Sequence, residues 1–352
     1  MCRKIPQIRL NFAAMVKYAL IIPVFNRPDE VDELLQSLTA QTFTDFEVVV
    51  VEDGSAIPCK DVVGKYAGSL TIHYYTKENG GPGKARNYGV ARTKAPYVVV
   101  LDSDAVLPPG YLAAIEAELA AAPCDAFGGP DRAHPSFTPM QKAINYAMTS
   151  FFTTGGIRGG KRKMDKFYPR SFNMGVRRAV YHELGGFSAM RFGEDIDFST
   201  RLIRSGHVSR LFQSAWVWHK RRTDLRKFFK QVHNSGIARI HLTKRHPGTL
   251  KAVHMLPAVF TLGCALLVVL AVVAALLGCP HWWALLLPFV LFALIIGVDA
   301  TRSERSVGVG WRAVAAAYVQ LTGYGSGFLR AWWTRCVLRR GEFEAFKENF
   351  YK

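Results

Sequence analysis

The sequence predicts an α/β protein with a mostly parallel sheet and helices on both faces, followed by a helical hairpin that crosses a membrane. Strand-like and helix-like segments alternate four times in the first 120 residues, which is the pattern of parallel strands joined by helices. Residues 252–298 then contain no Asp, Glu, Lys or Arg. That stretch is long enough for two membrane crossings of about 20 residues each.

The composition limits the classes of function. Charged residues are 20% of the 352 residues and hydrophobic residues are 49%, which excludes a disordered or low-complexity chain. The formal net charge is +18, and such an excess predicts an anionic partner: nucleic acid, anionic lipid or a phosphate-bearing substrate. The 6 cysteines form no Cys-x-x-Cys pair. A reducing cytosol is therefore favoured over a disulfide framework or a zinc site.

The predicted sheet is built from short apolar segments. Four of them are expected as strands: residues 18–24, 46–51, 71–75 and 97–101. The second is nearly all apolar, as a strand buried on both faces would be. Pro28 suits the first turn of a helix after the first strand, and Asp29 and Glu30 complement its dipole. Before the fourth strand, a glycine-rich turn runs into another helix.

Acidic residues directly follow two of these strands. Asp53 closes the second strand, and Asp102 and Asp104 follow the fourth, at the carboxyl ends where parallel sheets bind ligands. Residues two apart in an extended chain point to the same side, so Asp102 and Asp104 suit one Mg²⁺ or Mn²⁺ ion with a nucleotide diphosphate as further ligand. Asp53 is expected to accept a hydrogen bond from a base or ribose. For all three, a solvated turn is the alternative.

Residues 79–87 resemble a phosphate-binding loop only superficially. Glu78 and Ala85 break the Walker pattern, which requires Gly and Ser or Thr near the loop lysine. The plain interpretation is a glycine turn that begins a helix. Lys84 and Arg86 can still neutralise a diphosphate there.

A second acidic cluster contains Glu194, Asp195 and Asp197 and precedes a helix. Such residues compensate a helix dipole. If they face the ligand-binding crevice at the carboxyl ends of the strands, one of them can act as a general base toward an acceptor hydroxyl. His219 is a candidate metal ligand, although a single histidine is more often structural or exposed.

The apolar stretch breaks at residues 278–281, where Pro280 stops a helix. We therefore expect membrane helices at about 254–277 and 282–299, with Trp282 and Trp283 in an interfacial aromatic belt. A buried hairpin in a soluble core is the alternative.

Basic residues flank both ends of the hairpin. Residues 219–251 contain ten Lys or Arg against one acid, and Arg302, Arg305 and Arg312 follow the second helix. Both ends should then be cytoplasmic and in contact with anionic lipid. A third segment, about 313–333, is moderately apolar with basic residues on both sides, which favours an interfacial helix over a third crossing.

The expected organisation has five parts. Residues 1–14 lack the apolar core of a signal peptide, which places the catalytic portion in the cytosol. The parts are an N-terminal extension (1–15), a catalytic domain (16–230), a basic juxtamembrane segment (231–252), two transmembrane helices (253–300), and a cytosolic loop, amphipathic interfacial helix and basic tail (301–352).

Six short motifs occur in a fixed order. They are Pro23-Val24-Phe25-Asn26, Glu52-Asp53-Gly54-Ser55, Gly83-Lys84-Ala85-Arg86-Asn87, Asp102-Ser103-Asp104, Gly185-Gly186-Phe187 and Glu194-Asp195. The ordered set resembles a family 2 glycosyltransferase of the GT-A fold and of the bacterial membrane-anchored type. The resemblance covers about residues 17–220.

The resemblance implies roles for these residues. Asp53 would contact the nucleotide base, and Asp104 with Asp102 would hold Mg²⁺ or Mn²⁺ at the donor diphosphate, with His219 as a possible further ligand. Asp195 would be the base, with Glu194 beside it. The implied donor-binding residues are Pro23, Phe25, Asn26, Asp53, Lys84, Arg86, Asn87, Asp102 and Ser103. A metal and nearby cations would stabilise the charge that develops on the leaving diphosphate.

The expected function is an inverting, metal-dependent hexosyltransferase-like enzyme of the inner (cytoplasmic) membrane, with its catalytic domain on the cytosolic side. It would move one sugar from a nucleotide sugar to a polyprenyl-linked saccharide in cell-surface polysaccharide synthesis. Residues 218–222 lack the Gln-x-x-Arg-Trp motif of processive synthases, and residues 125–192 are expected to form the acceptor side. The alternatives are a polyprenyl-phosphate sugar synthase and, remotely, a membrane-tethered nucleic-acid or lipid-binding protein; no nucleic-acid partner is expected.

Overall fold

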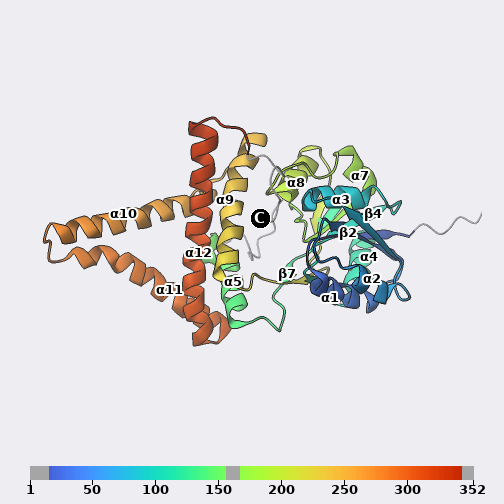
Figure 1. The fold of residues 1–352 in the computed structure, drawn as a ribbon, viewed down its shortest axis with the longest axis horizontal. Helices are drawn as coiled ribbons and strands as arrows, with labels where there is room; N and C mark the ends of the chain where they lie inside the picture. The colour runs from blue at the N-terminus through green and yellow to red at the C-terminus, as the bar shows by residue number, and fades with distance from the viewer. Residues whose placement is uncertain (1–15, 156–166, 343–352) are drawn as a thin grey trace, which may run out of the picture.

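Residues 16–155 and 167–342 are described by the computed structural model, in which an α/β domain and a helical module lie side by side (Figure 1). The main sheet of the α/β domain has the strand order β3-β2-β1-β4-β8-β6-β9. Its strands are β1 (Tyr18–Val24), β2 (Phe46–Asp53), β3 (Ile72–Lys77), β4 (Tyr97–Leu101), β6 (Ala126–Gly128), β8 (Asn173–Arg177) and β9 (Ser209–Leu211). The sequence-based prediction of a mostly parallel α/β sheet is confirmed.

The first four strands are mutually parallel, and β8 runs antiparallel to both β4 and β6. All four lie close to the predicted segments. The second extends further than expected, to Asp53, because Glu52 and Asp53 still pair in register with Thr76 and Lys77 of β3. The polar end of β2 is therefore part of the sheet and not a turn.

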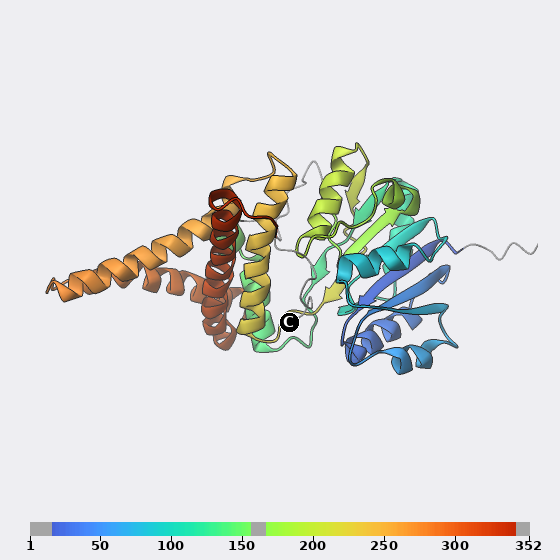
Figure 2. The same cartoon turned by 45° about the horizontal axis from the view of Figure 1, so that its top comes forward.

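Helices cover both faces of this sheet, as predicted (Figure 2). One face packs against α1 (Pro28–Thr39), α2 (Lys60–Tyr66) and α4 (Tyr111–Ala121). The other packs against α3 (Pro82–Val90), α7 (Arg178–Glu183) and α8 (Glu194–Arg204). Strands β1, β2 and β4 contribute alternate side chains to both cores, so their central residues are apolar on both faces.

A second, three-stranded sheet lies beside the end of β4. It has the order β5-β10-β7, with β5 (Ala105–Val106), β10 (Val217–His219) and β7 (Asp131–Arg132). In its antiparallel register, His219 lies opposite Ala105. This pairing brings His219 next to Asp104, which precedes it by more than a hundred residues in the chain.

The helical module contains α5 (Pro139–Thr149), α6 (Phe151–Thr154), α9 (Leu225–Arg245), α10 (Leu256–Leu276), η2 (Trp282–Leu286), α11 (Leu287–Glu304) and α12 (Val307–Trp332). Helices α10 and α11 form the expected hairpin and project away from the α/β domain, crosswise to α9 and α12 (Figure 1). Two helical segments, Leu256–Leu276 and Trp282–Glu304, are long and apolar enough to span a membrane. Their side chains are mostly exposed.

The segment expected at about 313–333 is the C-terminal part of α12, which begins earlier and lies against α9. Its glycines permit this close approach: a Cβ on Gly327 would lie 1.9 Å from the His233 carbonyl oxygen, and one on Gly236 of α9 would lie 2.1 Å from that of Tyr324. Small residues at helix crossings let backbones approach in this way. The glycines that lower the hydrophobicity of this segment therefore serve the packing of α12 against α9.

The structure also bears on the expected domain limits. Helix α9 runs through the expected boundary at residue 230 without a break, so most of the basic segment expected at 231–252 is helical. The N-terminal extension 1–15, residues 156–166 of the expected acceptor side and the tail from residue 343 lie outside the described residues.

Candidate active site

The predicted acidic clusters lie at one end of the main sheet. Asp53 ends β2, and Asp102 and Asp104 follow β4, so the parallel strands place them along the same edge. The small second sheet adds His219 to this edge. Glu194 and Asp195 form the first turn of α8 and approach from the side.

Three of these residues form a candidate metal site. His219 Nε2 lies 3.1 Å from Asp104 Oδ1 and 3.8 Å from Asp102 Oδ2, and one donor atom from each residue lies within 4.8 Å of the others. Two carboxylate oxygens and one imidazole nitrogen fit a divalent cation. A mixed oxygen and nitrogen set suits Mn²⁺ better than Mg²⁺, which prefers oxygen alone.

Two arginines hold the carboxylate oxygens on the other side. Arg86 Nη2 lies 2.8 Å from Asp102 Oδ1, and Arg27 Nη1 lies 2.7 Å from Asp104 Oδ2. The oxygens that face His219 are therefore the ones that these arginines do not bind. The arginines orient both carboxylates, as outer partners of metal ligands do.

The charges of this site depend on one another. Burial alone would raise the pKa of Asp104, but His219 and Arg27 lower it well below its usual range. Burial alone would lower the pKa of His219, but the Asp104 and Asp102 carboxylates raise it. Asp104 therefore stays ionised at neutral pH, and an ionised carboxylate can ligate a divalent cation.

Arg86 connects the candidate metal site to α8. Its guanidinium is buried between Asp102 and Glu194, with Nη1 2.9 Å from Glu194 Oε1, and lies 5.3 Å from the centre of the Phe187 ring. Asp102, which the sequence assigns to the donor side, and Glu194, which it assigns to the acceptor side, therefore both bind the Arg86 guanidinium. The two sets of carboxylates belong to a single cluster.

The two carboxylates at the start of α8 have different surroundings. Burial raises the pKa of Glu194, and Arg86 only partly offsets this. Burial would also raise the pKa of Asp195, but Arg170, whose Nε lies 2.7 Å from Asp195 Oδ2, lowers it. Asp195 therefore stays ionised at neutral pH and can accept a proton.

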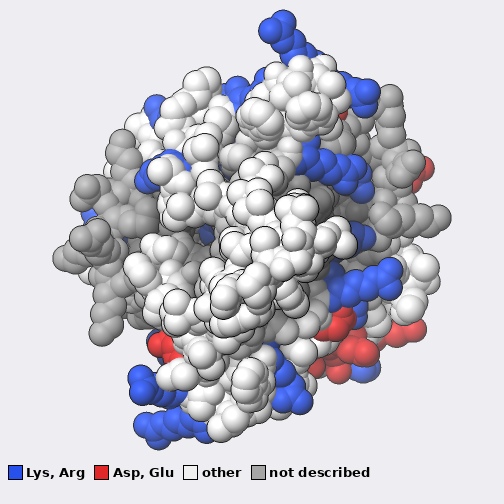
Figure 3. Space-filling model, turned by 90° about the vertical axis from the view of Figure 1, so that its left-hand side faces the viewer, with Lys and Arg blue, Asp and Glu red and all other residues white. Residues whose placement is uncertain are grey.

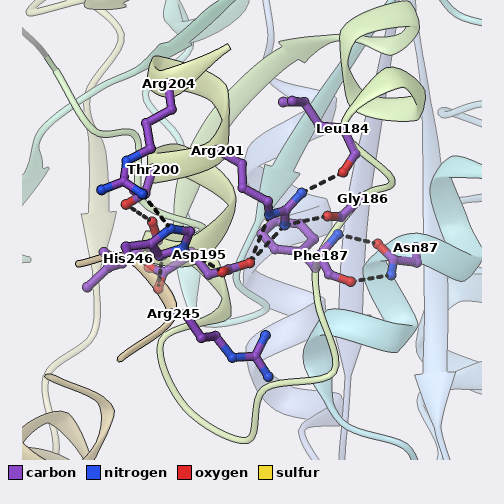
Figure 4. Close-up of polar contacts among 12 residues, drawn as sticks. Asn87, Leu184, Gly186, Phe187, Asp195, Thr200, Arg201, Arg204, Arg245 and His246 are labelled. Carbon is purple, nitrogen blue, oxygen red and sulfur yellow. Dashed lines mark hydrogen bonds and ion pairs between the residues drawn. The ribbon is translucent and has the colours of Figure 1, made fainter. Parts of the chain in front are cut away.

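Helix α8 is fixed from both sides. Arg201 donates hydrogen bonds to the carbonyl oxygens of Leu184 and Gly186, as Figure 4 shows. Asp197 binds Arg201 and also His246, which follows α9, at 2.8 Å. The start of α8 is thereby tied to the helical module, which positions Glu194 and Asp195 relative to α9.

Some residues proposed as donor-binding have internal partners. The Asn87 amide donates to the Phe187 carbonyl and accepts from the Phe187 N–H (Figure 4). Asp53 is 1% exposed, binds Lys77, and accepts from the N–H groups of Gly80 and Gly81 at 3.0 and 2.7 Å. In this structure both residues hold loops around the crevice, and their proposed contacts with a donor stay predictions.

The other proposed donor-binding residues line the same region. Pro23 is the partly exposed residue of β1, Phe25 is half-buried, and Ser103, which lies between the two site aspartates in sequence, is buried. Asn26 accepts from the N–H groups of Ala56 and Ile57 and so joins the loops after β1 and β2. Lys84 is exposed on α3.

The sequence did not single out four charged residues of the site: Arg27, Asp131, Arg170 and Arg221. Arg27 directly follows the Pro-Val-Phe-Asn motif, which is the only signal that could have indicated it. The others come from loops and short strands whose position only the fold determines. Each of them binds an acidic or basic partner more than twenty residues away.

Comparisons with known proteins agree with this geometry. The model of the family described as "Glycosyl transferase family 2" matches residues 19–185. The chain is 29% identical over 239 residues to the pre-mycofactocin glycosyltransferase of Mycobacterium tuberculosis, covering 65% of this chain and 48% of that protein. It is 39% identical over 94 residues to the poly(ribitol-phosphate) beta-N-acetylglucosaminyltransferase TarS of Staphylococcus aureus, covering 26% and 16%.

The chain thus spans about half or less of the length of these curated relatives. Among solved structures, the mannosyltransferase PcManGT from Pyrobaculum calidifontis, in complex with GDP-Man and Mn²⁺, has a TM-score of 0.61 at 18% identity and covers 86% of this chain and 87% of its own. This likeness shows the fold. Residues 19–185 therefore form a domain that matches glycosyl transferase family 2, and the described structure has the GT-A fold.

Proposed function

We propose that the protein is an inverting, metal-dependent glycosyltransferase that moves one sugar from a nucleotide-sugar donor to a lipid-linked saccharide acceptor. The observation that carries this proposal is the cluster in which Arg86 joins the Asp102, Asp104 and His219 donor set to Glu194 and Asp195. Sugar transfer requires stabilisation of a leaving diphosphate and removal of a hydroxyl proton. The two halves of the cluster match these two requirements.

Residues of the donor half would bind the leaving group. A divalent cation held by Asp102 Oδ2, Asp104 Oδ1 and His219 Nε2 would neutralise the diphosphate charge that develops as the sugar–oxygen bond breaks. Lys84, exposed at the start of α3, adds a positive charge close to the glycine turn. The pocket for the nucleoside would be shaped by the remaining proposed donor-binding residues: Pro23, Phe25, Asn26, Asp53, Asn87 and Ser103.

Residues of the acceptor half would activate the attacking group. The acceptor hydroxyl oxygen would attack the anomeric carbon from the face opposite the diphosphate, and Asp195 would take its proton. Glu194, bound to Arg86, would keep the guanidinium between the two halves. Attack from the opposite face inverts the anomeric centre, and fixed positions for donor and acceptor supply much of the rate enhancement.

This function can be tested with the purified full chain in detergent and a panel of UDP-, GDP- and dTDP-sugars. With a bacterial lipid extract as acceptor source, one donor should release its nucleoside diphosphate and label the lipid fraction. EDTA should abolish the release, and added Mn²⁺ should restore it. Full turnover in EDTA would contradict the metal role, and no turnover with any donor would contradict the proposed activity.

One observation favours a second candidate, transfer to polyprenyl phosphate itself. Arg170 is bound to Asp195 but remains 40% exposed, so a cation is available where the acceptor would bind. A phosphate acceptor is already ionised at neutral pH and needs no base. The product distinguishes the two candidates, since this reaction gives a phosphodiester and the first gives a glycoside.

We also propose that the hairpin of α10 and α11 anchors the enzyme in the inner membrane, with the α/β domain in the cytosol. A helix of 21 residues is about 31 Å long, which matches a hydrocarbon core of about 30 Å. Seen from the hairpin side, lysines and arginines flank an uncharged centre, and acidic residues are also exposed in the lower part of the view (Figure 3). Such an arrangement suits a hairpin in the bilayer and basic residues at anionic head groups.

The crosswise arrangement has a consequence for α9 and α12. Both helices run transverse to the hairpin (Figure 1). If the hairpin crosses the bilayer, α9 and α12 therefore lie along the membrane surface. This supports the expected interfacial position of α12. The exposed Trp282 and Trp283 at the hairpin tip would then reach the far interface.

Two native cysteines test this topology. Cys279 is exposed at the hairpin tip and Cys336 is exposed after α12. In intact spheroplasts, a membrane-impermeant maleimide should label a variant with Cys279 as its sole cysteine, whereas a variant with only Cys336 should react only after permeabilisation. Labelling of both on the same side of the membrane would contradict the crossing, and the cysteine-free chain is the matched control.

A further inference from the structure

Beyond the candidate metal ligands, an acidic residue lies on the other side of the His219 ring. Asp131 is in β7, whose parallel register with β10 places it beside Val217. Its Oδ2 lies 4.0 Å from His219 Nδ1, whereas Nε2 faces Asp104 and Asp102. The Phe172 ring stacks on the imidazole at 5.2 Å with an interplanar angle of 12°. The ring is therefore held in a plane that points one nitrogen at each acidic group.

Arg221 holds Asp131 in this place. Its Nη2 lies 2.6 Å from Asp131 Oδ2, and its side chain is 7% exposed. Two residues of α5 fix Arg221 in turn: Asn145 accepts from its Nε at 3.0 Å, and Gln141 donates to its carbonyl oxygen at 3.0 Å. A chain of contacts thus runs from α5 of the helical module to His219.

We propose that Asp131, held by Arg221, is a positioning residue that orients His219 toward a bound divalent cation. The proposal rests on the metal site of the proposed function. A cation at Nε2 needs the lone pair of that nitrogen, so the ring proton must be on Nδ1. Nδ1 faces Asp131, and metal-binding histidines commonly donate this second N–H to a carboxylate.

The 4.0 Å separation fits this role. In the arrangement described, His219 Nε2 contacts Asp104 directly at 3.1 Å. Hydrogen bonds between nitrogen and oxygen are shorter than about 3.2 Å, so a displacement of the imidazole by about 1 Å would bring Nδ1 and Oδ2 to hydrogen-bond distance.

The experiment is a titration of the purified full chain with Mn²⁺, followed by electron paramagnetic resonance of the free ion, without any donor substrate. Asp131→Ala should weaken Mn²⁺ binding by about 10- to 100-fold, the usual effect of removing an outer partner of a metal ligand. Asp131→Asn keeps an acceptor oxygen and should weaken binding less than Asp131→Ala. It also tests the proposal if the alanine variant does not fold.

Asp125→Ala is the matched control. Asp125 also lies between an arginine and a histidine, 3.3 Å from Arg177 and 3.5 Å from His207, but these residues are not part of the candidate site. Its replacement should leave Mn²⁺ binding unchanged. An equal loss in Asp125→Ala would show a general effect of removing an ion pair and would overturn the proposal.

A double-mutant cycle separates positioning from a purely structural role. In a His219→Ala background, Asp131→Ala should cause no further loss of Mn²⁺ affinity, because no ring remains to be oriented. An undiminished loss in that background, or unchanged affinity in both Asp131 variants, would overturn the inference alone. Failure of the unaltered chain to bind Mn²⁺ would overturn the metal site of the proposed function as well.

Discussion

Replacing Asp104 with Asn should reduce sugar transfer by about 1000-fold or more, which corresponds to about 4 kcal/mol of transition-state stabilisation. Asp104 is buried, and its Oδ1 lies 3.1 Å from His219 Nε2. The amide removes one charge from the donor set and also removes the ion pair with Arg27, which is 2.7 Å from Asp104 in the unaltered chain. Both changes oppose binding of a cation.

The measurement is turnover at saturating donor over a range of Mn²⁺ concentrations, together with Mn²⁺ affinity. Asp32→Asn is a suitable control, because Asp32 pairs with Lys65 on the surface of the α/β domain and such pairs contribute little. If Asp104→Asn kept more than a tenth of the turnover with unchanged Mn²⁺ affinity, Asp104 would not be a metal ligand.

The second large effect is expected at Asp195. Asp195→Asn should lower kcat by about 10²- to 10⁴-fold, the usual contribution of a general base, with the donor KM changed little. Because Arg170 lowers the pKa of Asp195, Asp195 stays ionised over the neutral range. Turnover that depends on this base should be lost only when the pH falls through the lowered pKa and the carboxylate is protonated. Glu194→Gln should instead weaken donor and metal binding, since Glu194 holds Arg86 beside Asp102.

Steady-state kinetics of the two variants separate these roles through kcat and KM. Glu183→Gln is the control, since Glu183 is a mostly exposed acid at the end of α7. Full turnover of Asp195→Asn would make the base assignment wrong. It would also favour the phosphate acceptor of the second candidate function, which needs no proton removal.

Much of the fold could be predicted from local patterns in the sequence. The run of valines in β2 and in β4 indicates strands buried on both faces, and the structure places neither of them at an edge of the sheet. The rule that ligands bind at the carboxyl ends of parallel strands was enough to select Asp53, Asp102 and Asp104. The uncharged stretch after residue 251 predicted the hairpin of α10 and α11.

The arrangement of the candidate site could not be predicted in the same way. His219 faces Asp104 because β10 pairs with β5, two short strands that carry no pattern of their own. Asp53 and Asn87 belong to the expected motifs, yet the structure shows their polar atoms bound to nearby loops. Arg170 lies beside Asp195 although no motif contains it.

Local patterns along the chain were sufficient to predict the class of the sheet, the acidic strand ends and the two helices suited to a membrane. These features follow from the spacing of apolar residues and from single residues such as Pro280, which act over a few positions along the chain. The pairing of charged side chains, in contrast, depends on the packed fold, which places Arg86 between Asp102 and Glu194, Arg27 on Asp104, and Asp131 beside His219. Ion pairs depend on distances across the fold, and residues far apart in sequence approach one another only after the sheet and the helices have packed.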